Sequence, residues 1–319
     1  MGNALKPVST VLPTALETDA DAARDFARES LSPATRRAYR SDIRAFEAWC
    51  RERGLVALPA EPESVASFLA HEAQRGLAVS SISRRAAAIR LLHRGAGQTS
   101  PTESEIVRST LRGIRRTLGV APKQKRPLTS ELLLSLLGHI PDSLRGKRDL
   151  ALLLLGFSGA FRRSTLAMLE VEDLEEVAGG LRVHVRRSKT DQEGQGAVVP
   201  IVRGRTACPV EAVNDWLASA EITAGPIFRR MGRGGRVFPV ALTPFSVGQI
   251  VKRYVEAAGL DPSEFGGHSL RAGFITSAVE NGASVFRTMD VSLHRRVETL
   301  RGYVRRAEEF KDHAGDGLL

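Results

Sequence analysis

Cysteine is scarce in this 319-residue chain. It contains two cysteines, Cys50 and Cys208, which lie far apart in the sequence. Two isolated thiols provide neither a disulfide framework nor the paired spacing of a zinc site. We therefore expect no disulfide and no cysteine-bound metal, which fits the reducing cytoplasm.

Long hydrophobic runs are also lacking. The longest, Leu150–Phe157, is far shorter than the roughly 20 residues that a membrane helix needs. The N-terminus shows no secretory signal, and Lys6 stands where a myristoylation site needs Ser or Thr. The sequence predicts no membrane partner.

Acidic residues are outnumbered. Lys and Arg total 46 against 36 Asp and Glu, a net charge of +10 with a pI near 10.3. Residues 31–116 hold 15 basic and 8 acidic residues, net +7, whereas residues 128–319 hold 25 and 23, net +2. Arginine, which far outnumbers lysine, suits bidentate contacts to phosphate and guanine. The excess indicates a polyanionic partner, although a compositional bias of the genome explains it equally well.

The first third of the chain is predicted to contain a small helical domain. Residues 1–25 have no periodicity and are expected to form a disordered tail, and the domain spans 26–118. Ser32-Pro33 should open a helix that Gly54 stops. Three more helices are predicted, over 63–75, from Ser80–Ser81 to Arg94, and from Thr102, where Thr-Glu-Ser-Glu has a capping-box pattern, to Arg116.

A basic, proline-punctuated linker over 119–127 leads to a second domain over 128–319. Helices are predicted over 128–140, 144–157, 209–220 and 244–258. Alternating apolar residues predict a strand over 181–186, preceded by an Ala-Gly-Gly hairpin turn. A second turn over 192–196 leads to another predicted strand over 197–202. The fold class is therefore mainly α with a small antiparallel β-sheet.

Six residues of the second domain provide the groups that a covalent phosphoryl transfer requires. A tyrosine can attack phosphorus if charged donors stabilise the extra negative charge of the transition state. An acid, lysine or histidine, must protonate the leaving oxygen. The candidate catalytic residues are Arg162, Lys189, His268, Arg271, His294 and Tyr303.

Each candidate has a simpler explanation when taken alone. His268 and Arg271 could be a pair on a helix surface, and Tyr303 a packing tyrosine. Lys189 could be a solvated turn residue, and Arg162 could pair with Glu170 or Glu172. The acidic cluster over 170–176 has no known metal-binding spacing and is expected to be a solvated face.

Taken together, the motifs resemble the tyrosine recombinase (phage integrase) family. The catalytic boxes are GFSGAFRRSTLAML, RRSKTD, GGHSLRAGF and HRRVETLRGYVRR. The segments TRRAYRSDIRAFEAWC, SSISRRAAAIRLLH and LRGIRR resemble the helical, SAM-like core-binding domain of that family. The resemblance covers nearly everything after residue 30.

The resemblance implies an enzyme that cuts and rejoins DNA without metal or ATP. Tyr303 would form a 3′-phosphotyrosyl bond, while Arg162, Arg271 and His294 hold the non-bridging oxygens. Lys189 would protonate the leaving 5′-oxygen, with help from His268 in proton transfer. Strand exchange would pass through a Holliday junction in a homotetramer on two double-stranded DNA sites, with the segment 305–319 docked on a neighbouring protomer. Candidate DNA contacts in the first domain are Arg36, Arg37, Arg84, Arg85 and Arg90.

Three positions depart from the family pattern. Thr165 stands where an acid is usual, Leu293 where glycine is frequent, and Arg296 where a small residue such as serine is usual. Two other functions therefore compete with recombination. One is a nicking and closing activity like that of type IB topoisomerases, and the other is DNA binding by a copy that has lost turnover.

Overall fold

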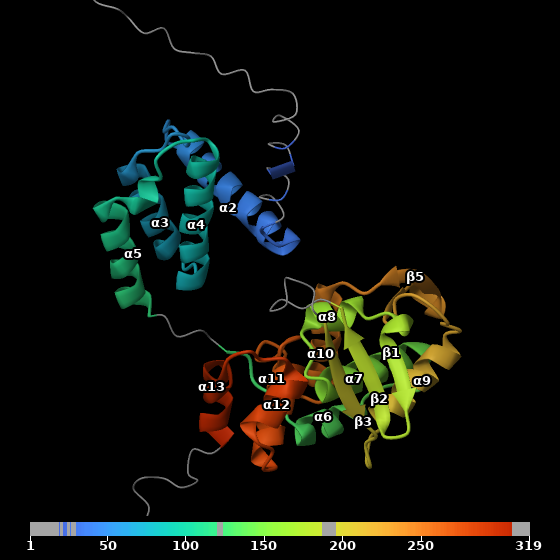
Figure 1. Ribbon diagram of the computed structural model, residues 1–319. Helices are drawn as coiled ribbons and strands as arrows, with labels where there is room; N and C mark the ends of the chain where they lie inside the picture. The colour runs from blue at the N-terminus through green and yellow to red at the C-terminus, as the bar shows by residue number, and fades with distance from the viewer. Residues whose placement is uncertain are drawn as a thin grey trace, which may run out of the picture. The chain divides into compact units, whose positions relative to one another are not determined.

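The structure is a computed structural model that describes residues 30–119, 124–186 and 196–307, together with residues 19, 22, 23 and 26 (Figure 1). The chain divides into two compact units, Met1–Lys123 and Gln124–Leu319. The predicted tail over 1–25 lies largely outside the described residues. Within the described ranges, every helix is too short or too polar to cross a bilayer.

The first unit is a bundle of α2 (Pro33–Glu52), α3 (Pro62–Gln74), α4 (Val79–Gly95) and α5 (Glu105–Leu118). The predicted start of α2 is confirmed, because the Ser32 hydroxyl accepts a hydrogen bond from the amide of Thr35 at 3.2 Å. Four buried side chains from three helices fill the centre of the bundle: Phe46, Trp49, Phe68 and Ile82.

The predicted capping box at the start of the fourth helix is wrong. Residues Pro101–Glu103 form a separate 3₁₀ turn, and α5 begins only at Glu105. The hydroxyl of Ser104, the residue that precedes α5, donates to the carbonyl of Pro101 at 2.8 Å. Because it is engaged with the preceding turn, this hydroxyl does not cap the helix.

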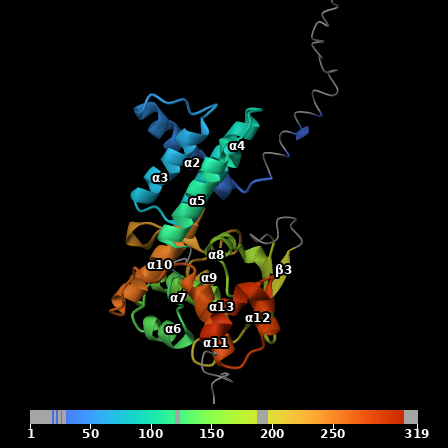
Figure 2. The same cartoon turned by 90° about the vertical axis from the view of Figure 1, so that its left-hand side faces the viewer.

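The second unit is built around the buried helix α7 (Leu144–Ser158). Its other helices are α6 (Ser130–Leu137), α8 (Arg163–Met168), α9 (Pro209–Ser219), α10 (Pro244–Ala257), α11 (Ser269–Glu280), α12 (Val285–Ser292) and α13 (Val297–Ala307). The views in Figures 1 and 2 both place α11, α12 and α13 side by side. This cluster brings together the histidine, arginine and tyrosine candidates from the end of the chain.

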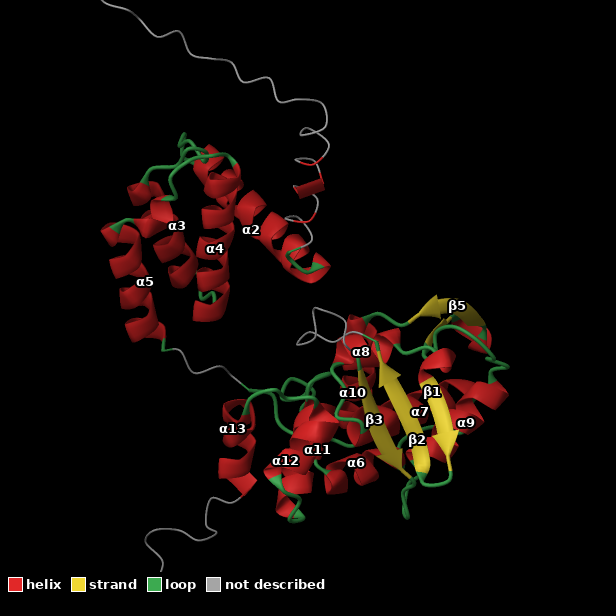
Figure 3. Ribbon diagram, in the orientation of Figure 1, coloured by secondary structure: helices red, strands yellow, loops and turns green. Residues whose placement is uncertain are grey.

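The strands β1 (Leu174–Val177), β2 (Gly180–Val185) and β3 (Ala197–Val202) form an antiparallel sheet in that order. Figure 3 shows this sheet beside α7 and α9. The predicted strands β2 and β3 are confirmed, with Val183 opposite Val199. The predicted Ala-Gly-Gly turn joins β1 to β2, where Gly180 (φ 150°) leaves no room for a Cβ beside the carbonyl of Ile201.

Sequence patterns did not predict β1, β4 (Arg229–Met231) or β5 (Val237–Ala241). The acidic segment forms the strand β1 because its carboxylates accept hydrogen bonds from basic or amide side chains on neighbouring elements. Glu175 accepts from Arg182 on β2 at 3.0 Å, and Glu176 accepts from Asn214 on α9 at 3.0 Å. Pairing with β2 thus overrides the weak strand propensity of glutamate.

Candidate active site

Arg162 is the residue that precedes α8, at the turn that follows α7. Ala160 in this turn is buried and has a positive φ of 45°. The Arg162 side chain is half-buried, and burial lowers its pKa. Among the described residues it has no ion pair or side-chain hydrogen bond, so its charge is available to an anion.

The acids that could have neutralised Arg162 are occupied elsewhere. Glu170 accepts from Arg186 at 2.8 Å, and Asp173 lies 2.6 Å from the same guanidinium. Glu172 accepts from the amide of Gly225 at 3.0 Å. The acidic cluster over 170–176 therefore does not replace the carboxylate that the family usually has at position 165. No group of metal-ligating side chains forms in the described part of the chain.

The start of α11 positions His268 and Arg271. A Cβ on Gly267 would lie 3.1 Å from Cβ and Cδ of Arg163, so glycine allows the starts of α8 and α11 to approach each other. One turn later, Arg271 is buried, and its Nη1 donates to the carbonyl of Ala160 at 2.6 Å. This bond ties α11 to the turn that carries Arg162.

Burial and the nearby charge of Arg162 lower the pKa of Arg271 to about 9, so the guanidinium stays charged at neutral pH. Two arginines that share a partly desolvated site repel each other by an energy on the order of a few kcal/mol. An anion between them would relieve that repulsion.

His294 follows the last turn of α12. Nη2 of Arg271 lies 2.9 Å from its Nε2, and the Ser292 hydroxyl lies 2.8 Å from its Nδ1. Burial and the charges of Arg271, Arg162 and His268 lower the pKa of His294 to about 3. The imidazole is therefore neutral at pH 7.

The backbone conformation of Leu293 explains why glycine is frequent at this position in the family. Leu293 has left-handed backbone angles (φ 52°, ψ 43°) at the end of α12. Glycine adopts this conformation freely, whereas another residue pays about 1–2 kcal/mol. The Leu293 side chain packs against the hydrophobic core, which offsets part of that cost.

Tyr303 lies on α13 and faces the start of α11. Its hydroxyl lies 3.1 Å from Nε2 of His268, across 35 positions of sequence. Burial and the charges of Arg271, Arg162 and Arg163 lower the pKa of His268. A neutral histidine beside a phenol is placed to accept its proton.

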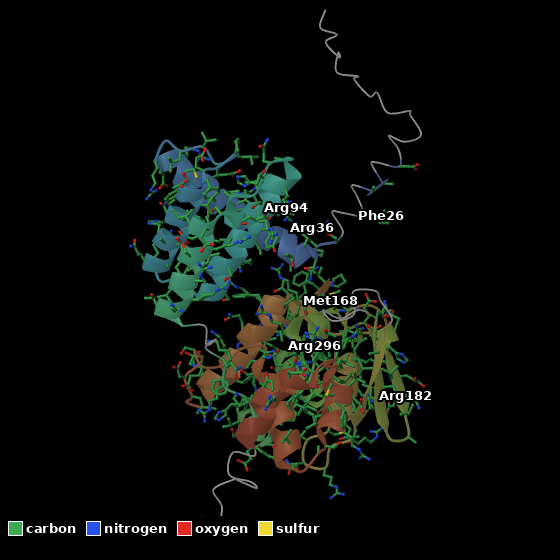
Figure 4. The ribbon with its side chains drawn as sticks, turned by 60° about the vertical axis from the view of Figure 1, so that its left-hand side comes forward. Phe26, Arg36, Arg94, Met168, Arg182 and Arg296 are labelled. Carbon is green, nitrogen blue, oxygen red and sulfur yellow. The ribbon has the colours of Figure 1, made fainter. Side chains whose placement is uncertain are left out.

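Two further positions singled out in the sequence are Lys189 and Arg296. Lys189 lies outside the described residues, between Arg186 at the end of β2 and Gly196 before β3. Arg296, on the segment before α13, is exposed, and Figure 4 shows it on a different element from Arg182 of the sheet. The bulk of Arg296 is thus accommodated without burial.

The structure distinguishes the arginines predicted to contact DNA. Arg84 donates to buried Asp42 through Nε at 2.7 Å and Nη2 at 3.1 Å. Arg85 is mostly buried and pairs with Asp42 and Glu72. Arg90 pairs with Glu103 at 3.0 Å. These three predicted arginines, all on α4, are therefore partly or wholly neutralised within the unit.

The outer face of α2 carries basic residues that sequence reasoning missed. Arg40 and Arg44 are exposed, and among the described residues neither has an ion pair or a side-chain hydrogen bond. With Arg36 they form a row at four-residue spacing, the signal that could have identified them. They line a shallow groove of about 390 Å³ with Leu31, Tyr39, Ile43, Glu47 and Leu91.

Both units match known protein families. Residues 26–99 match the family described as "Phage integrase, N-terminal SAM-like domain", and residues 126–309 match "Phage integrase family". The second match alone covers more than half of the chain.

Two relatives are similar over most of their length. A xerD-homologous integrase/recombinase of Selenomonas ruminantium is 37% identical over 286 residues, covering 88% of this chain and 84% of that protein. The recombinase cre of Escherichia phage P1 is 26% identical over 298 residues, covering 87% of this chain and 85% of that protein.

Solved structures share the fold. The Tn1549 transposon integrase in complex with transposon right-end DNA has a TM-score of 0.59 at 16% identity, covering 90% of this chain and 96% of that one. The XerH recombinase bound to a palindromic difH substrate has a TM-score of 0.57 at 21% identity, covering 78% and 71%. The predicted fold class, mainly helical with a small antiparallel sheet, is confirmed.

Proposed function

Since the chain belongs to the phage integrase family, the tyrosine recombinases, we propose that it exchanges DNA strands through a covalent bond between DNA and Tyr303. The observation that carries the proposal is the convergence of five side chains from four segments. Tyr303 contacts His268, and Arg271 contacts His294, while Arg162 lies at the turn whose carbonyl holds Arg271.

Each group has a defined part in the proposed reaction. His268 takes the proton of the Tyr303 hydroxyl as the phenolic oxygen attacks a scissile phosphate. The phosphorus–5′-oxygen bond breaks, which leaves a 3′-phosphotyrosyl ester and a 5′-oxygen. Lys189 protonates that 5′-oxygen. Arg162, Arg271 and His294 stabilise the charge on the non-bridging oxygens.

The reverse reaction reseals the DNA. A 5′-hydroxyl from a second duplex attacks the ester and releases Tyr303, so the bond energy is conserved without ATP or metal. Two such exchanges pass through a Holliday junction, for which we propose a homotetramer on two double-stranded DNA sites.

The test begins by identifying the DNA. The protein selects its site from random duplexes, and a nicked suicide duplex with that site then traps the covalent adduct. A trapped adduct excludes a DNA-binding protein without turnover. Recombination between two copies of the site separates a recombinase from a nicking and closing enzyme.

We expect Thr165→Glu to raise the cleavage rate on the suicide duplex by roughly tenfold, which requires about 1.4 kcal/mol of transition-state stabilisation. Thr165 lies three residues after Arg162, in the first turn of α8, and the nearby acids are bound to other partners. A carboxylate at this position would hold an arginine by a charged hydrogen bond and favour the helix N-terminus. Thr165→Gln is the matched control, and an unchanged or lower rate for Thr165→Glu would remove this explanation.

DNA binding should weaken steeply with salt, with a log–log slope on the order of −5 or steeper. Because neither Arg40 nor Arg44 has an ion pair among the described residues, replacing either with Ala should make the slope shallower by about one. Replacing Arg85 with Ala should instead lower the free energy of unfolding, because the buried carboxylates of Asp42 and Glu72 lose their ion pairs with Arg85. The same slope for wild type and Arg40→Ala would argue against α2 as a phosphate-binding face.

A further inference from the structure

A buried hydroxyl lies behind the histidine that follows α12. Ser292 has no exposed surface, and its Oγ lies 2.8 Å from Nδ1 of His294. Leu293 between them has left-handed backbone angles, and the amide of His294 returns to the carbonyl of Met289 at 3.3 Å. This helix ending turns the chain so that side chains two positions apart meet.

Hydrogen-bonding rules place the proton on the His294 ring. Arg271 can only donate, so the ring nitrogen that it contacts must be an acceptor. Its Nη2 lies closer to Nε2, at 2.9 Å, than to Nδ1, at 3.2 Å. A neutral imidazole has one acceptor nitrogen. We assign the acceptor to Nε2, the nearer nitrogen, so that Nδ1–H donates to the hydroxyl of Ser292.

The proposed reaction requires Nε2 of His294 to carry the proton and to act as a donor. To stabilise a non-bridging phosphate oxygen, His294 must donate a hydrogen bond from the side that faces Arg271. A main-chain carbonyl or a carboxylate behind the ring could only accept, and would hold the proton on Nδ1. A serine hydroxyl can accept from Nδ1–H or donate to an unprotonated Nδ1, so it stays bonded in both arrangements.

We propose that Ser292 is a positioning residue that holds His294 through Nδ1 and lets Nε2 change from acceptor of Arg271 to donor to the phosphate. This inference rests on the proposed function. When the phosphate binds, Nδ1 loses its proton to water and Nε2 takes one from water, so the ring remains neutral. The hydroxyl of Ser292 reverses from acceptor to donor.

The first test is single-turnover cleavage of the suicide duplex. Ser292→Ala should slow cleavage about tenfold, a loss similar to that found when the hydrogen-bond partner of a metal-binding histidine is removed. The dissociation constant for DNA should change less than about twofold. Ser292→Thr, which keeps the hydroxyl, should recover most of the rate. The control is Ser277→Ala, which removes another buried hydroxyl, one that accepts from the amide of Ser130 at 2.9 Å, and should cleave normally.

A double-mutant cycle separates positioning from a general structural role. In a His294→Ala background, Ser292→Ala should change the rate less than about twofold, because the ring through which Ser292 acts is gone. An additional tenfold loss in that background, or a wild-type rate for Ser292→Ala alone, would overturn the proposal.

Ring nitrogen-15 spectra of His294 in the DNA-free protein supply a readout that needs no activity. The wild-type spectrum should show protonated Nδ1, and Ser292→Ala should lose this preference. A protonated Nε2 in the wild type would refute the assignment. If wild-type protein forms no adduct at all, the proposed function fails, while the spectra still decide whether Ser292 sets the histidine tautomer.

Discussion

Tyr303→Phe should abolish the covalent adduct with the suicide duplex while leaving DNA affinity within about twofold of wild type. The substitution removes only the phenolic oxygen, which lies 3.1 Å from Nε2 of His268. The ring remains, so the packing of α13 should be retained. Denaturing gel electrophoresis of protein crosslinked to labelled DNA measures the adduct.

The chain provides a matched control for this experiment. Tyr254 is buried on α10, and its hydroxyl donates to Asp149 at 2.9 Å. Tyr254→Phe should lower the free energy of unfolding by roughly 1–3 kcal/mol and still form the adduct. An adduct with the Tyr303→Phe protein would show that another residue is the nucleophile.

Arg271→Lys should lower the cleavage rate by about 10²–10³, corresponding to some 2.7–4 kcal/mol of lost transition-state stabilisation. The guanidinium makes two bonds in fixed directions, from Nη1 to the carbonyl of Ala160 at 2.6 Å and from Nη2 to His294 at 2.9 Å. A lysine ammonium is a single point of charge and cannot reproduce this fork. Single-turnover rates with saturating protein isolate this effect from DNA affinity.

Arg182→Lys is the corresponding control. Arg182 is exposed on β2 and pairs with Glu175 at 3.0 Å, so its replacement should leave the cleavage rate within about twofold of wild type. A comparable rate for Arg271→Lys and Arg182→Lys would mean that Arg271 contributes only charge, and that the fork is not required.

Several features of this protein follow from its sequence alone. Helices with clear capping residues were predicted well. The helix α2 is an example, because Ser32 and Pro33 favour a helix start through contacts within its first turn. The strand β2 was predicted because its alternating pattern reflects one buried face, and β3 because an apolar segment follows a turn. The residue types and order of the catalytic candidates indicated phosphoryl transfer, because that chemistry demands a nucleophile, acids and positive charge.

Other features depend on contacts between segments distant in sequence. No local pattern shows that Glu170 and Asp173 pair with Arg186, so that neither neutralises Arg162. Nor does any pattern show that Asp42 holds Arg84 across 42 positions. Charged side chains take the partners that packing brings near, and several partners are equally possible from the sequence.

The surroundings of His294 depend partly on the local sequence and partly on tertiary contacts. The sequence identified the histidine and marked Leu293 as unusual, because both observations concern single positions. Only the folded chain determined that α11 brings Arg271 to the ring, closest to Nε2, and that the end of α12 brings Ser292 to Nδ1. Hydrogen bonds and desolvation act over a few ångströms, so the protonation of this group depends on neighbours that only tertiary packing supplies.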